Sequence, residues 1–128
     1  MSKNNPIVKL TYKHEFFDIN EMRIGARTIT TITEDGIIVV RDYKPGNRKA
    51  YSTKHTTCSI EQFQELCNKL EACIETANNW DLWVDDCSEE LKLFYKYNRI
   101  QIVDRGLGND ETAIGVIMRR FLSELRWD

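Results

Sequence analysis

Residues 27–49 read RTITTITEDGIIVVRDYKPGNRK, and this stretch decides the fold. Thr, Ile and Val fit the pleated, half-buried surface of a β-sheet, so the stretch predicts strands on both sides of Asp35-Gly36. Asp-Gly favours the type I′ turn, whose twist matches that of two paired strands. Pro45-Gly46 predicts a second turn, because proline presets φ and glycine accepts a positive φ. We therefore expect the chain to run down, back and down again as an antiparallel meander.

The register of this hairpin depends on the length of its first turn. If Asp35-Gly36 alone forms the loop, Ile32 faces Val39 across the two strands. Apolar residues occupy both parities of residues 37–40, so periodicity does not select the buried face. A strand inside the sheet, covered at least partly on both sides, explains this pattern. Residues 50–57 are polar and rich in Thr, which predicts a weaker strand nearer the edge.

The segment before the hairpin alternates with a period of two. Val8, Leu10 and Tyr12 share one parity, and Lys and Thr residues fill the other. This alternation predicts a strand that starts at Ile7 and has one buried and one wet face. Residues 18–25 are expected to be a connection.

Two amphipathic helices are predicted. Ser59 and Gln62 fit a capping box, and Glu65 and Lys69 have the favourable i, i+4 order. Apolar residues then recur at helical spacing: Ile60, Phe63, Leu66, Cys67, Leu70, Cys73, Ile74 and Ala77. Residues 78–79 are expected to end this helix, because Asn tolerates the left-handed conformation. A second stripe predicts a C-terminal helix, capped by Asn109 or Asp110: Ile114, Ile117, Met118, Phe121, Leu122 and Leu125.

The segment between the helices predicts a second hairpin. Residues 91–97 and 100–103 alternate, with a turn near residues 97–99. Residues 80–84 are expected to be a strand or a covering loop, and residues 85–90 an acidic connection. Segregated runs of strands favour a single two-layer α+β domain. We expect an antiparallel β-sheet of meander and hairpins with two α-helices packed on one face, in the order β-β-β-β-α-β-β-α, over residues 6–128, after a disordered polar tail at residues 1–5.

Composition narrows the function classes. The 128 residues carry 18 Lys and Arg against 20 Asp and Glu, a net charge of −2. Dedicated nucleic-acid binders are usually clearly basic, so nucleic acid is the less favoured partner. No apolar run reaches the ~20 residues that span a bilayer, and no secretory signal is visible. These features predict a cytoplasmic protein with no membrane association and with reduced cysteines.

A basic segment with interleaved aromatic residues is the first candidate binding site. Its members lie around the second turn: Arg41, Tyr43, Lys44, Arg48, Lys49, Tyr51 and Lys54. Such a pattern can hold single-stranded nucleic acid on a sheet. It also arises where Lys protects a wet sheet edge from aggregation. An acidic protein partner is a third interpretation, because complementary charge steers association.

A Gly-rich loop is the second candidate, as a phosphate site. Its residues precede the last helix, where backbone amides can bind an anion: Arg105, Gly106, Gly108 and Asn109. The loop lacks the third Gly of a dinucleotide fingerprint and the Lys-Ser/Thr of a P-loop. Asp110 and Glu111 also place negative charge there, which favours a plain strand-to-helix turn.

The remaining polar clusters predict no complete chemical site. The acidic residues of the second half fit a solvated loop and lack calcium-loop spacing: Asp81, Asp85, Asp86, Glu89 and Glu90. His55 and Cys58 form one loose pair, where zinc needs about four ligands. Cys58 beside His55 is the one plausible thiol nucleophile. No metal, cofactor or catalytic residue is predicted.

These observations favour a small non-enzymatic cytosolic protein-binding domain of the inhibitor, immunity or accessory type. The first alternative is a small-ligand or phosphate-binding protein, or an enzyme, that uses residues 105–110. The second alternative is a single-stranded nucleic-acid binder that uses residues 41–54. A monomer or small homo-oligomer is expected.

Overall fold

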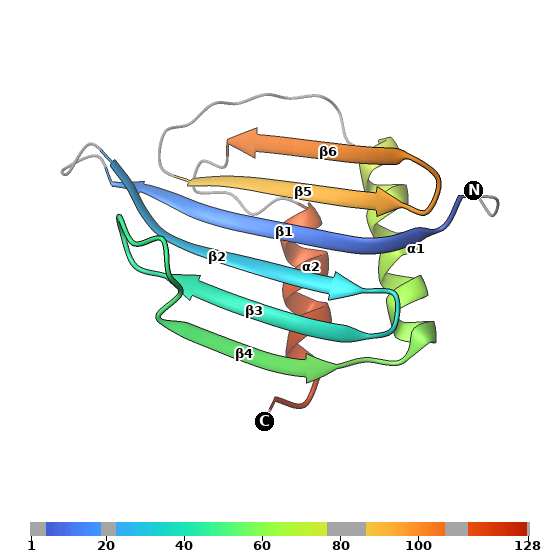
Figure 1. Cartoon of the computed structure of the whole chain (residues 1–128). Helices are drawn as coiled ribbons and strands as arrows, with labels where there is room; N and C mark the ends of the chain where they lie inside the picture. The colour runs from blue at the N-terminus through green and yellow to red at the C-terminus, as the bar shows by residue number, and fades with distance from the viewer. Residues whose placement is uncertain (1–4, 19–22, 77–86, 107–112, 128) are drawn as a thin grey trace.

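The computed structural model describes residues 5–18, 23–76, 87–106 and 113–127. Six strands form one antiparallel sheet in the order β4-β3-β2-β1-β5-β6, and both helices lie on the same face and run across the strands (Figure 1). The elements are β1 Ile7–Asp18, β2 Arg23–Thr33, β3 Ile37–Tyr43, β4 Ser52–Thr57, α1 Ile60–Thr76, β5 Cys87–Tyr95, β6 Arg99–Gly106 and α2 Ala113–Ser123. The predicted α+β fold and its element order are confirmed.

Strand β1 joins the two halves of the sheet. It pairs with β2 on one side and with β5 on the other. Leu10 lies between Ile32 and Leu93 in register, and all three side chains are fully buried. The predicted alternation is confirmed from Lys9 onward, because Leu10 and Tyr12 face the helices while Lys9 and Lys13 lie on the other face. At the start of the strand it is wrong: the register shifts between Ile7 and Lys9, and Ile7 rather than Val8 is buried in the core.

The turn between β2 and β3 differs from the prediction. The Gly36 amide donates to the Thr33 carbonyl at 2.9 Å, and Gly36 has a φ of 85° while Asp35 has no positive φ. The loop therefore has three residues and ends in a left-handed glycine, in place of a two-residue type I′ turn. Ile32 consequently pairs with Ile38, and the expected pairing with Val39 is wrong. The added residue sets the register in which both isoleucines are fully buried.

The second turn and the edge strand follow the prediction. The Asn47 amide donates to the Lys44 carbonyl at 3.1 Å across Pro45-Gly46, where Gly46 has a φ of 75°. Strand β4 then forms one edge of the sheet. Its Thr56 hydroxyl donates to the carbonyl of Arg126, which ties the C-terminal segment to this edge.

Helix α1 begins at the predicted capping box. The Ser59 amide donates to Gln62 Oε1 at 2.8 Å, and the Gln62 amide donates to Ser59 Oγ at 3.0 Å. The helix buries its stripe against the sheet through Phe63, Leu66, Cys67 and Leu70. Ile60 departs from the predicted stripe and is 58% exposed, because this first helical residue borders an open groove.

Helix α2 completes the core. Ile114 and Met118 are fully buried, and Ile117, Phe121 and Leu122 pack half-buried against them. This confirms the predicted stripe as far as Leu122; α2 ends at Ser123, so Leu125 packs against the core from beyond the helix. Within the described residues, neither helix combines the length and the apolarity that crossing a membrane requires.

Strand boundaries extend beyond the predicted ones where pairing with β1 or β5 continues. β2 starts at Arg23 rather than after residue 25, since Ile24 pairs with Phe17. β5 starts at Cys87 within the expected acidic connection, and β6 continues to Gly106. The predicted helix end at residues 78–79, the segment 80–84 and the cap at 109–110 lie outside the described residues.

Candidate functional site

The structure separates the predicted basic segment into three places. Arg41 and Tyr43 lie on β3, on the sheet face opposite the helices, here called the open face. Lys54 pairs with Val40, which packs against the core, so Lys54 belongs to the other face. The remaining members lie exposed in the β3–β4 connection: Lys44, Arg48, Lys49 and Tyr51. The segment is therefore not one continuous patch.

Register adds further residues to the open face. Strand pairing places five basic residues there, against three acidic residues: Lys9, Lys13, Arg27, Arg41 and Lys92, with Glu15, Glu90 and Asp104. Two of the cations have a carboxylate partner, in the pairs Lys13–Glu15 at 4.0 Å and Lys92–Glu90 at 3.5 Å. The open face is thus basic although the chain as a whole is acidic.

Apolar side chains accompany these cations at the β6 end. Ile100 is 56% and Ile102 57% exposed, and they pair with Phe94 and Lys92 of β5. Val39 of β3 lies on the same face, but strands β2, β1 and β5 separate β3 from β6. Single exposed isoleucines are common, but two at i, i+2 beside an aromatic ring form a contiguous apolar strip. The alternation of residues 100–103 is visible in the sequence. The position of this strip near Lys9 follows only from the order of the strands, in which β5 lies between β1 and β6.

The aromatic rings of this region carry cations over their faces. The Arg27 guanidinium lies 4.4 Å from the centre of the Tyr43 ring, and the Lys9 ammonium 5.2 Å from that of Phe94. In the β3–β4 connection, Lys44 Nζ lies 5.3 Å from the Tyr51 ring centre. These distances fit cation–π contacts, which hold the long basic side chains against the sheet.

Glu89 is a buried carboxyl group that the sequence analysis did not predict. It belongs to the acidic run expected to be solvated, yet it is 1% exposed and accepts a hydrogen bond from the Tyr12 hydroxyl at 2.6 Å through Oε2. Its other oxygen, Oε1, is buried and has no hydrogen-bond partner among the described residues. The expectation of a solvated loop is wrong here because Glu89 shares the parity of Leu91 and Leu93 in β5. Of the same run, Glu90 lies on the open face, and residues 81, 85 and 86 lie outside the described residues.

Part of the predicted phosphate loop is adjacent to Glu89 in register. Arg105 of β6 and His14 of β1 both pair with Glu89, one on each side. Gly106 is the last residue of β6 and pairs with Ser88. Gly108 and Asn109 lie outside the described residues. Among the described residues, no three His, Cys, Asp or Glu side chains gather in a way that could hold a metal ion.

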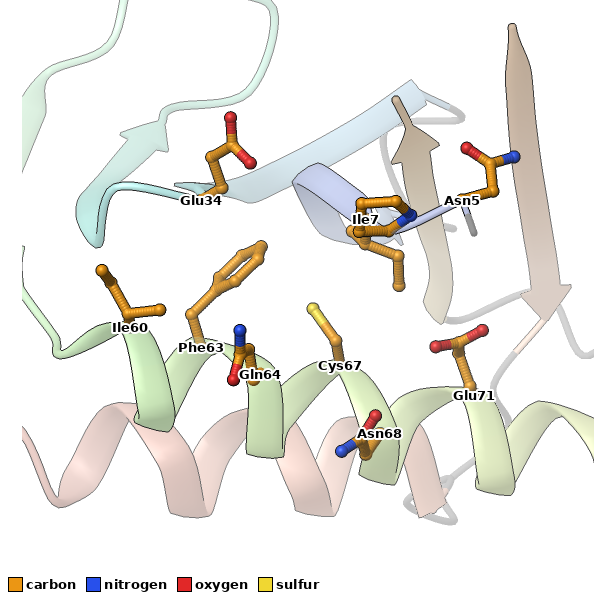
Figure 2. A pocket seen from close by; sticks show the side chains of 10 residues that line it. Asn5, Ile7, Glu34, Ile60, Phe63, Gln64, Cys67, Asn68 and Glu71 are labelled. Carbon is orange, nitrogen blue, oxygen red and sulfur yellow. The ribbon is translucent and has the colours of Figure 1, made fainter. Parts of the chain in front are cut away.

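A groove of about 490 Å³ lies along α1, between this helix, the start of β1 and the β2–β3 turn (Figure 2). Ile7, Phe63 and Cys67 form its apolar floor and are all buried. Figure 2 shows Glu71 at one end of the groove and Glu34 above Phe63 toward the other end, with the Glu34 carboxylate directed away from α1 and the Cys67 sulfur directed into the space between α1 and Ile7. The Asn5 side chain, at its edge, accepts a hydrogen bond from the Tyr97 amide at 2.8 Å.

The titratable groups on the inner wall of this groove have raised pKa values, mainly because they are buried. Burial, with the Glu71 carboxylate, raises the pKa of the Cys67 thiol to about 12. Burial and Glu71 also raise the pKa of Tyr95 to about 12, and the Tyr95 hydroxyl donates to Glu71 Oε2 at 3.1 Å. Cys67 is therefore a neutral thiol at physiological pH. Burial raises the pKa of Cys58 as well, which disfavours the thiolate that a nucleophile requires.

Cys67 should make the protein less stable in alkali. The unfolded thiol ionises near its ordinary pKa of 9.0 and the folded thiol near about 12, so between these values the folded chain holds the extra proton. The free energy of unfolding then falls as the pH rises, by at most about 1.4 kcal/mol per pH unit from this group. Urea unfolding between pH 9 and 12 should give a shallower decline for Cys67→Ala than for the parent. Parallel slopes in the two proteins would contradict this assignment.

No family model matches the chain, and no curated protein matches it either.

Proposed function

We propose that this chain is a non-enzymatic cytoplasmic protein-binding domain, of the inhibitor, immunity or accessory type, whose open face docks an acidic protein partner. The observation that carries the proposal is the excess of cations over carboxylates on the open face, beside the exposed strip of Ile100 and Ile102. Basic groups around an apolar strip suit a protein interface, in which apolar contact supplies affinity and charge steers the encounter.

Three open-face cations have no carboxylate partner among the described residues. Lys9 and Arg27 lie over aromatic rings, and Arg41 is exposed on β3. Lys9 and Arg27 are already restricted by their ring contacts, so they lose less side-chain entropy on binding than a free surface lysine does. They are suited to receive carboxylates from a partner.

The ring contacts favour protein over single-stranded nucleic acid as the partner. Base stacking needs an aromatic face that is free to accept a base. Tyr43, Phe94 and Tyr51 each have a cation of this chain over the ring. A base would have to displace that cation or use the opposite ring face. Carboxylates of a protein partner could approach the same cations without displacing them.

Affinity capture from native host lysate with charge-reversal variants tests the proposal. A Lys9→Glu, Arg41→Glu variant replaces two open-face cations with carboxylates, and both are surface changes with a small expected effect on folding. We expect one protein partner that survives nuclease treatment and is recovered about tenfold less by this variant, because like charges now oppose each other. The measurement is quantitative mass spectrometry of captured protein at low and high salt.

Lys54→Glu is the matched control, since it reverses a basic residue on the same sheet but on the other face. It should capture the partner as the parent does. Equal losses for both variants would show a non-specific charge effect and would contradict the open-face assignment. Recovery of nucleic acid alone, lost at high salt, would instead favour the nucleic-acid alternative.

A further inference from the structure

The groove along α1 is chemically distinct from the open face. The ten described residues that line it include two carboxylates and no Lys, Arg or His. The neutral rim groups are the side-chain amides of Asn5, Gln64 and Asn68. An apolar floor with acidic ends complements a ligand that has an apolar centre and cationic ends.

The length of the groove follows from the helix that forms one wall. The lining residues of α1 run from Ile60 to Glu71 on a single helical face. At about 1.5 Å per residue, this wall is about 16 Å long. In an extended peptide, side chains at positions 1, 3 and 5 point to one face, and positions 1 and 5 lie about 13 Å apart. Five extended residues therefore match the groove.

We propose that this groove binds an extended segment of a protein partner in which two basic residues flank an apolar residue at alternate positions. The apolar side chain lies over the nearly buried Phe63 and Cys67 and contacts the exposed Ile60 beside them, and the basic side chains reach Glu34 toward one end and Glu71 at the other. Because the Cys67 thiol is neutral, it accepts apolar contact without adding charge. The groove and the open face use different residues, so this proposal stands or falls independently of the proposed function.

A peptide titration followed by backbone amide NMR tests this proposal. The probe is acetyl-Lys-Ser-Leu-Ser-Lys-amide, and the charge-reversed control is acetyl-Glu-Ser-Leu-Ser-Glu-amide. At about 0.01 M ionic strength, the basic peptide should give saturable shifts at Phe63, Cys67 and neighbouring amides, and the acidic peptide should not. Binding should weaken at about 0.15 M ionic strength, because salt screens exposed charges.

Carboxylate-to-amide variants assign the two ends. Glu34→Gln and Glu71→Gln should each weaken the basic peptide about two- to fivefold, as expected for partly exposed ion pairs. Glutamine at position 71 can still accept the hydrogen bond from Tyr95, so the fold should be retained, and a dispersed amide spectrum checks this. Glu65→Gln is the control, because Glu65 lies on α1 outside the groove and pairs with Lys69 at 3.1 Å.

Three results would overturn the proposal. These are the absence of saturable shifts along α1, equal shifts with the basic and acidic peptides, and unchanged affinity in both carboxylate variants. A third peptide, acetyl-Lys-Ser-Ser-Ser-Lys-amide, tests the apolar position. It should bind more weakly than the leucine peptide, and equal affinity would contradict the role of the floor.

Discussion

Replacing Gly36 with alanine is expected to lower the free energy of unfolding by about 2–5 kcal/mol. Gly36 has a φ of 85°, a conformation that costs an L-residue with a Cβ about 1–2 kcal/mol. A Cβ on this residue would also lie 2.1 Å from the carbonyl oxygen of Cys58, so the backbone would have to move. The Gly36 carbonyl accepts the Cys58 amide at 2.8 Å, and this bond connects the turn to the start of α1.

Gly46→Ala is the matched control for this prediction. Gly46 has a similar φ of 75° but lies exposed in the β3–β4 turn. Gly46→Ala should lower the free energy of unfolding only by the cost of the left-handed conformation, about 1–2 kcal/mol. Urea unfolding of the three proteins by circular dichroism measures the difference. Equal losses at the two glycines would show that the approach to Cys58 contributes nothing.

Local signals in the sequence predicted most of the fold. The capping box of Ser59 and Gln62 needs only neighbouring residues, so it could be predicted without tertiary information. The alternation of β1 and the stripes of both helices likewise reflect one buried face each. Turn length was the exception, because Asp-Gly serves two- and three-residue loops alike. Register was decided by the burial of Ile32 with Ile38, which local sequence does not reveal.

The candidate surfaces were less predictable because they depend on strand order. Lys9 meets Phe94 only because β1 pairs with β5, and the residues of the α1 groove come from three separate segments. Lys54 and Arg41 were predicted to share one site because they are close in sequence. In the sheet, Lys54 of β4 pairs with Val40 rather than with Arg41, so the two basic residues lie on opposite faces. For Glu89, parity with Leu91 is the signal for burial, but it applies only because β5 starts at Cys87, inside the segment expected to be an acidic connection.

Replacing Tyr12 with phenylalanine is expected to cost about 2–3 kcal/mol of stability. The Tyr12 hydroxyl donates to Glu89 Oε2 at 2.6 Å, and Glu89 Oε1 is buried without a partner among the described residues. Removing the hydroxyl leaves the carboxyl group of a residue that is 1% exposed without this donor. Tyr95→Phe is the control, since its acceptor Glu71 is only half-buried and can be hydrated, so its loss should be smaller, about 1 kcal/mol or less.

A second substitution tests whether the buried Glu89 carboxyl group stabilises the fold. Glu89→Leu in the Tyr12→Phe background replaces both partners with apolar groups, and stability should return to within about 1 kcal/mol of the parent. If Tyr12→Phe alone costs less than about 0.5 kcal/mol, the hydrogen bond is not a stabilising contact. If the double variant is more stable than the parent, the buried carboxyl group lowers stability. Glu89 pairs with His14 on one side and with Arg105 on the other. A carboxyl group that lowers stability at this position would then indicate a functional role for this end of the sheet, since residues that serve a function commonly reduce stability.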